Sequence, residues 1–246
     1  MKQMLMLVLL AAVLATGVSA QSPFKSPEEQ EAFMNVQNAA SVQDRASAAV
    51  KFIADHSDSD YVGLASYMAM LSFQQLNDFE NMVLYGDMVL ESSPVPSVLT
   101  GTLISLAVAI PNRTREFDLD KEEKLAKAED FAKRAMALIP TLSKMDPSMT
   151  DDAWLQTKMD FMAQCHEAIG TVQLKRENYE QAEASLRRAL DMTPVPVAFT
   201  MYNLGIALSE QNKKEEAGTL FDRCSEAGGV QAGDGSDLCA TLKGEL

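Results

Sequence analysis

The sequence predicts an all-α fold, a right-handed α-solenoid of about five antiparallel helix pairs with a short C-terminal capping helix. Alternating apolar and polar residues, the pattern of strands, are absent, whereas apolar residues recur at helical spacing. The pattern of small and apolar residues that follows Gly170 restarts in part at Gly205, thirty-five residues later. Proline and glycine gather at intervals instead of being scattered. A fixed period of this size is typical of stacked helical repeats.

Residues 1–20 are expected to be a secretory signal peptide that is removed before Gln21. Lys2 supplies the positive charge, Met4–Ala15 is an unbroken apolar run of 12 residues, and Val18-Ser19-Ala20 fits the small-residue cleavage rule. The run is short for a bilayer span, although an uncleaved anchor is the alternative. No cysteine lies directly after the run to carry a lipid. The sequence therefore predicts an exported protein of bacterial type, periplasmic or secreted, without a stable membrane span after cleavage.

The remaining chain, 21–246, is expected to form one helical-repeat domain. Apolar spacing predicts the helices, and short polar turns separate the two helices of each pair. The expected pairs are 27–39 with 42–55, 61–76 with 79–91, 97–110 with 121–138, 149–176 with 179–191, and 196–211 with 214–227. A Gly-rich tail follows, and a short helix near Ser236–Lys243 is expected to cap the last pair.

Proline marks the ends of several pairs. Ser93-Pro94-Val95-Pro96 and Thr193-Pro194-Val195-Pro196 follow the second helices of two different pairs, and Pro140 ends the third pair. Proline cannot continue a helix, and it restricts the residue before it. The spacing between these ends varies because 111–120 and 141–150 contain extra residues. Such insertions map to loops, often on one face of an array, and their role here is left open.

The pattern after Gly170 resembles the tetratricopeptide repeat (TPR), a helix–turn–helix unit of 34 residues. Two repeats match best, over 163–196 and 198–231, and the earlier pairs match at fewer positions. The matching residues are Ile169-Gly170, Tyr179, Ala182, Leu186, Ala189 and Pro194 in the fourth pair, and Leu204-Gly205, Ala217 and Phe221 in the fifth. Gly170 and Ala182 are expected where two helices cross closely, with Leu186 between them. One pair cannot bury its own apolar face, so stability comes from its neighbours.

The net charge and the motifs limit the classes of function that the sequence supports. The net charge of −14 disfavours binding to nucleic acid or to anionic membrane, and it mildly favours a basic partner. The two histidines, His56 and His166, are too few for the usual zinc sites. The sequence contains no phosphate-binding loop and no nucleophile elbow. We therefore expect no catalytic residues, no cofactor and no metal.

In the TPR family, peptides usually lie in a concave groove that is lined by the first helix of each pair. The resemblance implies that the groove-facing residues here are Glu167, Thr171, Leu174, Phe199, Tyr202, Asn203, Ile206 and Ser209. Asn203 stands in a slot that holds Asn in members that clamp a C-terminal carboxylate, but the basic residues that complete such a clamp are not evident. For Phe199 and Tyr202, contact with a neighbouring helix or with the cap is an equally good interpretation.

Three cysteines, Cys165, Cys224 and Cys239, allow one disulfide and one free thiol. Cys224 stands in the repeat slot that faces the next element, and Cys239 lies in the expected capping helix. A bond between them would close a loop of about 15 residues and fasten the cap. Cys165 is expected to be a buried apolar residue.

One acidic cluster precedes and opens the helix predicted from residue 121. It could dock basic peptides, but complementing the helix dipole is the simpler interpretation. Its members are Glu116, Asp118, Asp120, Glu122 and Glu123.

Taken together, these features predict a non-catalytic scaffold that binds a protein or a peptide in the cell envelope or outside the cell. The first alternative is an accessory or assembly factor that holds an envelope enzyme or a membrane complex. The second, less favoured, is a thiol redox protein that uses Cys165 with Cys224 or Cys239.

Overall fold

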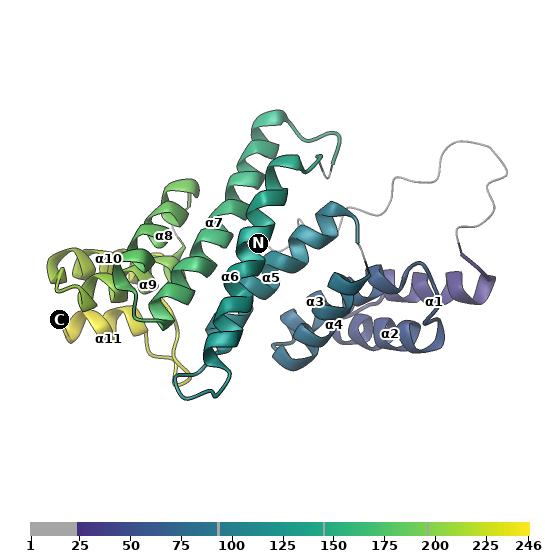
Figure 1. Cartoon of the computed structure of the whole chain (residues 1–246), viewed down its shortest axis with the longest axis horizontal. Helices are drawn as coiled ribbons and strands as arrows, with labels where there is room; N and C mark the ends of the chain where they lie inside the picture. Colours follow the sequence, from purple (N-terminus) through teal and green to yellow (C-terminus); the bar gives the residue numbers. More distant parts are fainter. Residues whose placement is uncertain (1–23, 93, 145, 196) are drawn as a thin grey trace. The chain divides into compact units, whose positions relative to one another are not determined.

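The computed structural model describes residues 24–92, 94–144, 146–195 and 197–246. The signal peptide expected at 1–20 lies outside these ranges. The regular structure in them is helical, apart from one isolated β-bridge between Gln231 and Asp237. The helices belong to two compact units, one formed by the chain up to Thr102 with Leu142–Thr150, and the other by Leu103–Thr141 with Asp151–Leu246 (Figure 1).

The first unit contains four whole helices and the start of a fifth. Its helices are α1 (Pro27–Gln37), α2 (Val42–Asp55), α3 (Val62–Gln75), α4 (Phe79–Glu91) and the beginning of α5 (Pro96–Arg113). From α1 to α4 each helix packs against the next. The aromatic rings of Phe33 and Phe52, whose centroids are 5.3 Å apart, lie in the core together with Ala65 and Ala69. The side chains of Ser26, Ser41 and Asp78 cap α1, α2 and α4 by accepting backbone N–H groups of the first turn.

The second unit contains the rest of α5 and all later helices. These are α6 (Lys121–Leu138), the short 3₁₀ helix η1 (Ile139–Thr141), α7 (Asp151–Lys175), α8 (Tyr179–Met192), α9 (Ala198–Glu210), α10 (Lys214–Glu226) and α11 (Leu238–Gly244). From α6 to α11 each α-helix packs against the next, and α7 also contacts α9. The prediction of an all-α fold built from consecutive helices is thus confirmed within each unit.

The helix α5 runs three residues past its expected end. The predicted helix ended at residue 110, but α5 continues through Pro111 to Arg113. Proline disturbs a helix chiefly on its N-terminal side, so it can occupy the last turn. Beyond it, the Thr114 N–H donates to the Ile110 carbonyl at 3.0 Å and closes that turn.

Glycines allow the closest helix crossings of the second unit. A Cβ atom at Gly170 would lie 2.5 Å from Cγ of Leu186, and one at Gly205 would lie 2.5 Å from Cε1 of Phe221. Both Leu186 and Phe221 are fully buried. The packing role predicted for Gly170 and Leu186 is confirmed, since a side chain at position 170 would collide with Leu186.

The same turn closes three helix pairs. One residue of each turn has left-handed backbone, with φ of 59° at Asn77, 61° at Glu177 and 61° at Asn212. The next N–H then donates to the carbonyl five residues before it, in each case at 2.9 Å: Asp78 to Phe73, Asn178 to Gln173, and Lys213 to Leu208. The repeated geometry includes the α3–α4 pair, in which the TPR sequence pattern is weak.

The C-terminal helix covers the last pair. α11 packs against α10, and a disulfide joins Cys224 of α10 to Cys239 of α11, with their Cα atoms 6.1 Å apart. The Asp237 side chain accepts the Cys239 N–H at 3.0 Å and caps α11. It also accepts the Val230 N–H at 3.3 Å and the Ser225 hydroxyl. The cap is therefore held by one covalent bond and by several hydrogen bonds.

Candidate functional site

The outward stripe of α9 is the first part of the candidate site. Four residues at helical spacing, Phe199, Tyr202, Ile206 and Ser209, are partly exposed. Most of the residues between them, from Thr200 and Met201 to Leu208, are buried in the core of the unit. Because the other sides of α9 pack in the core, the helix presents only a narrow and largely apolar stripe to solvent.

The corresponding stripe of α7 lies beside it. Glu167 and Leu174 are partly buried, and Thr171 between them is buried. Two side-chain hydrogen bonds join the helices: the Thr200 hydroxyl donates to the Glu167 carboxylate, and Asn203 Nδ2 donates to Thr171 Oγ1 at 3.2 Å. The eight predicted groove residues therefore lie on two helices that are in direct contact.

Two of these residues are turned into the contact between the helices. Asn203 is only 4% exposed, and its amide is used by Thr171. Asn203 therefore aligns α9 with α7, and its burial leaves little of the amide within reach of a ligand carboxylate. Thr200, which no motif singled out, is the partner of Glu167. The separations of 33 and 32 residues between the bonded positions, close to the repeat period, were the signal in the sequence for these pairs.

Glu167 gives this face its charge. Burial raises the pKa of its carboxyl above the ordinary value, and the hydrogen bond from Thr200 acts in the opposite direction. Among the described residues no basic side chain forms an ion pair with Glu167. A positive group supplied from outside would offset the desolvation of the carboxylate.

Aromatic rings lie next to this carboxylate. The centroids of Phe199 and Tyr202 are 6.3 Å apart, with 30° between the ring planes. Tyr202, Ile206 and Leu174 pack partly against the core of the unit, so each is anchored while part of it stays exposed. Burial also raises the pKa of the Tyr202 hydroxyl, which stays protonated and can donate a hydrogen bond. We name the surface formed by Glu167, Leu174, Phe199, Tyr202, Ile206 and Ser209 the α7–α9 face.

The cysteine thiols and the His166 imidazole are not arranged for catalysis or redox chemistry. Cys165 is buried, and burial raises the pKa of its thiol to about 12, so it is not a thiolate at neutral pH. Burial, and then the positive charge of Arg188, lower the pKa of the neighbouring His166. Cys224 and Cys239 are bonded to each other. This arrangement does not pair Cys165 with either of the other two cysteines.

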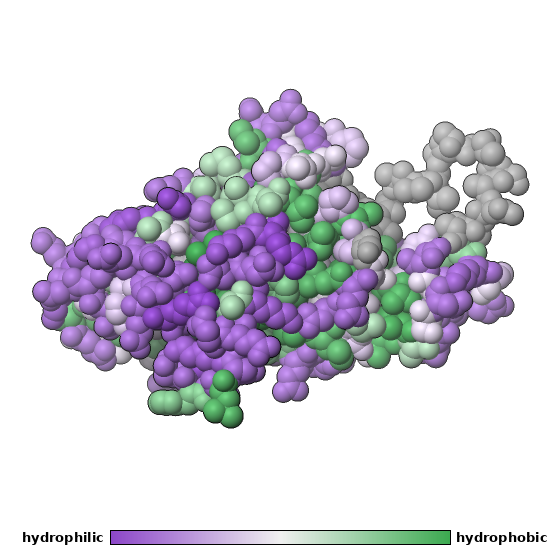
Figure 2. Space-filling model, viewed as in Figure 1, coloured by the Kyte–Doolittle hydropathy of each residue, from purple (hydrophilic) through white to green (hydrophobic). Residues whose placement is uncertain are grey.

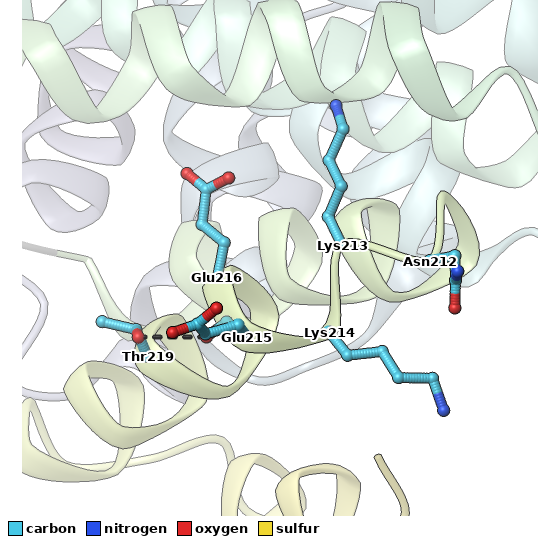
Figure 3. A pocket seen from close by; sticks show the side chains of 6 residues that line it. All are labelled: Asn212, Lys213, Lys214, Glu215, Glu216 and Thr219. Carbon is cyan, nitrogen blue, oxygen red and sulfur yellow. Dashed lines mark hydrogen bonds between the residues drawn. The ribbon is translucent and has the colours of Figure 1, made fainter.

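A shallow pocket at the start of α10 is a weaker candidate. Its lining residues are Asn212, Lys213, Lys214, Glu215, Glu216 and Thr219, and Figure 3 shows that their side chains diverge instead of converging. Several are already occupied, because Lys213 pairs with Glu183 at 2.6 Å and Glu216 pairs with Arg187 at 2.5 Å. This pocket lacks a set of free groups that could converge on a ligand.

Across the described ranges, no group of three or more His, Cys, Asp or Glu side chains is placed to hold a metal ion. No helix within the same ranges combines the length and apolar character that a membrane span requires.

Comparison with known proteins identifies one repeat. Residues 163–196, the C-terminal half of α7 with α8 and the segment after it, match the family model of the tetratricopeptide repeat. No curated protein matches the sequence. A solved structure described as "Assembly Chaperone of RpL4 (Acl4)" has a TM-score of 0.40 and 16% sequence identity, and the match covers 88% of this chain and 93% of that one. The family match begins and ends where the best repeat was predicted, so the chain contains a tetratricopeptide repeat at 163–196.

Proposed function

We propose that this protein is a non-catalytic scaffold that binds a protein or peptide segment on the α7–α9 face. One observation carries the proposal: partly exposed Phe199, Tyr202 and Ile206 lie in one stripe beside Glu167, whose carboxylate accepts from Thr200 and has no basic partner in the described structure. Partly buried aromatic side chains are common anchors of protein interfaces. The tetratricopeptide repeat at 163–196 supplies one of the two helices of this face.

The chemistry of the face defines the segment that it would bind. An apolar side chain of the partner would cover the rings of Phe199 and Tyr202 and remove them from water. A Lys, an Arg or a terminal amine would reach Glu167 and compensate its buried charge. The net charge of −14 would draw a basic segment toward the protein before contact. The preferred ligand is therefore a segment in which a basic residue is close to an apolar one.

We further propose that binding takes place after export, in the periplasm or outside the cell. The support is the N-terminal pattern of Lys2, the apolar run Met4–Ala15 and the small residues before Gln21. An oxidising compartment also suits the Cys224–Cys239 disulfide. N-terminal sequencing of the protein from its native cells tests this, and a mature chain that begins at Met1 or Lys2 would overturn it.

The binding test needs a defined partner. Chemical cross-linking in native cells, followed by mass spectrometry, identifies candidates, and each is then purified and titrated calorimetrically against the wild-type chain. Tyr202→Ala should weaken binding at least about tenfold, because a central aromatic anchor is lost. Glu167→Gln should weaken binding and reduce its salt dependence, because the charge is lost while the shape is kept.

Leu155→Ala is the matched control, since Leu155 is also an exposed apolar residue of α7 and lies outside the face. It should leave the affinity within twofold of wild type. If Tyr202→Ala and Leu155→Ala behave alike toward every purified partner, the α7–α9 face is not the binding site.

A further inference from the structure

The loop between α5 and α6 displays two large apolar side chains. Phe117 is 93% exposed and Leu119 is 108% exposed. The other exposed large apolar residues of the described chain reach only 37–63%. Figure 2 shows a hydrophobic tip at the bottom of the view, where Figure 1 places this loop. Scattered and half-covered apolar residues are normal on protein surfaces, but two neighbouring ones without cover point to a contact surface.

The loop is held in shape by its own hydrogen bonds. The Asp118 carboxylate accepts the Arg115 N–H at 3.1 Å, and the Asp118 carbonyl accepts the Lys121 N–H at 3.0 Å. Lys121 pairs with Glu116 at 2.8 Å, and Lys124 pairs with Asp118 at 3.0 Å. The loop is thus ordered before any partner arrives, and binding would not have to immobilise it. We name residues 116–120 the loop knob.

Acidic residues alternate with the two apolar ones. The order is Glu116, Phe117, Asp118, Leu119, Asp120, and Glu122 and Glu123 follow. The hydrogen bonds from the Arg115 N–H and from Lys124 lower the pKa of Asp118, which stays ionised at neutral pH. The carboxylates of Glu116 and Asp120 are more than half exposed, so basic residues of a partner can approach them while the ion pairs within the loop remain.

The acidic residues of the loop knob indicate which kind of binding partner could cover its two apolar side chains. An anionic bilayer would repel the acidic residues, and a second copy of this chain, whose net charge is also −14, would do the same. A protein surface with basic residues around an apolar pocket satisfies both features of the knob. We propose that Phe117 and Leu119 insert into an apolar pocket rimmed by Lys or Arg on a partner protein.

The test begins with a photo-cross-linker. p-Benzoylphenylalanine replaces Phe117 in the full chain, and a second chain carries it at Leu155 as a control for random capture. The proteins captured at position 117 are identified with their cross-linked peptides. The proposal requires that one such peptide lies in an apolar pocket with Lys or Arg at its edge.

Binding to that purified partner is then titrated with the wild-type chain and with two variants. The double variant Phe117→Ser with Leu119→Ser should weaken binding at least about tenfold, because two large apolar side chains lose their burial. Leu155→Ser should leave the affinity within twofold. Raising the salt concentration should weaken the wild-type complex, since the acidic and basic groups are exposed. Both knob residues are fully exposed, so the double variant should keep the far-UV circular dichroism of wild type.

Other outcomes overturn the proposal. These are no specific capture at position 117, cross-linking to a second copy of the chain, unchanged affinity of the double variant, and binding to phosphatidylglycerol vesicles that the double variant abolishes. The proposal takes the partner to be a protein but does not depend on the α7–α9 face. If Tyr202→Ala abolishes binding of the captured partner and the double variant does not, only the loop knob is contradicted. If the double variant abolishes binding and Tyr202→Ala does not, only the α7–α9 face is contradicted as the site for that partner.

Discussion

Replacing Gly170 by alanine would place a methyl group inside the closest crossing between α7 and α8. The new Cβ would lie 2.5 Å from Cγ of Leu186, 2.8 Å from its Cδ2 and 3.3 Å from its backbone nitrogen. Carbon atoms in contact normally lie about 3.5–4.0 Å apart. Leu186 would have to move by about 1 Å, and because its backbone is also close, rotating its side chain would not relieve every contact.

Two opposing effects set the size of the change. Over-packing of a well-packed core costs about 1–3 kcal/mol. Alanine in place of a helical glycine stabilises by about 0.5–1 kcal/mol. We therefore expect Gly170→Ala to lower the free energy of unfolding by about 1 kcal/mol, the difference between the centres of the two ranges. Gly218→Ala in α10 is the control, because its Cβ would meet only Leu246 Cδ1 at an ordinary 3.5 Å. It should raise the free energy of unfolding by about 0.5–1 kcal/mol.

Urea unfolding followed by tryptophan fluorescence measures both changes. Trp154 is the only tryptophan of the chain, and it is buried in α7, in the same unit as the two glycines. Adding Leu186→Ala to Gly170→Ala should destabilise by less than the sum of the two single changes, since the clash is then removed. If Gly170→Ala proves as stable as wild type, or if Gly218→Ala is equally destabilising, the packing argument for this crossing is wrong.

Three further predictions use the same fluorescence measurement. Cys224→Ala with Cys239→Ala should lower the free energy of unfolding by about 3 kcal/mol, because a loop of 15 residues is no longer closed in the unfolded chain; a loss below about 1 kcal/mol would show that the disulfide contributes little. Glu177→Gly should raise the free energy of unfolding by up to about 1 kcal/mol, because the left-handed φ of 61° costs a non-glycine residue about 1–2 kcal/mol and the greater freedom of glycine in the unfolded chain offsets about 0.5–1 kcal/mol of this; a lower stability would mean that the Glu177 side chain contributes more than its backbone costs. Glu167 has a raised pKa in the folded chain, so its ionisation opposes folding, and its effect on stability should become more unfavourable as the pH rises from the ordinary Glu value through the folded pKa. The unfolding free energy of wild type minus that of Glu167→Gln should therefore fall over that pH range, and a difference that is independent of pH would contradict the assignment.

The packing of the repeats was predictable because it depends on positions where the size of the side chain decides which residue fits. Gly170 and Gly205 stand where no Cβ fits, and Leu186 and Phe221 fill the space opposite them. These positions appear in the sequence at a fixed spacing. The α3–α4 pair was harder to recognise, since Met82 and Gly86 replace the usual small and large residues. Its turn at Asn77 nevertheless has the geometry of the other two, because backbone hydrogen bonding and one left-handed residue suffice for it.

The candidate site was only partly predictable. Spacing of three and four residues assigns a side chain to one side of a helix, but that side is more than 100° wide. Thr171 and Asn203 lie at its edge and turn toward each other, whereas Tyr202 and Ile206 remain partly exposed. The exposure of Phe117 could not be predicted from the sequence, because the residues around it show only a cluster of acidic charge. Whether an apolar loop residue is covered depends on packing that is remote in the sequence.

Hydrogen exchange of the protein with and without its purified partner tests the proposed scaffold function most directly. Binding on the α7–α9 face should slow exchange in 163–175 and 198–210, the segments of α7 and α9 that carry it, because a bound segment restricts the opening of both helices. A complex that forms while exchange in these two segments stays the same would contradict the proposed binding site.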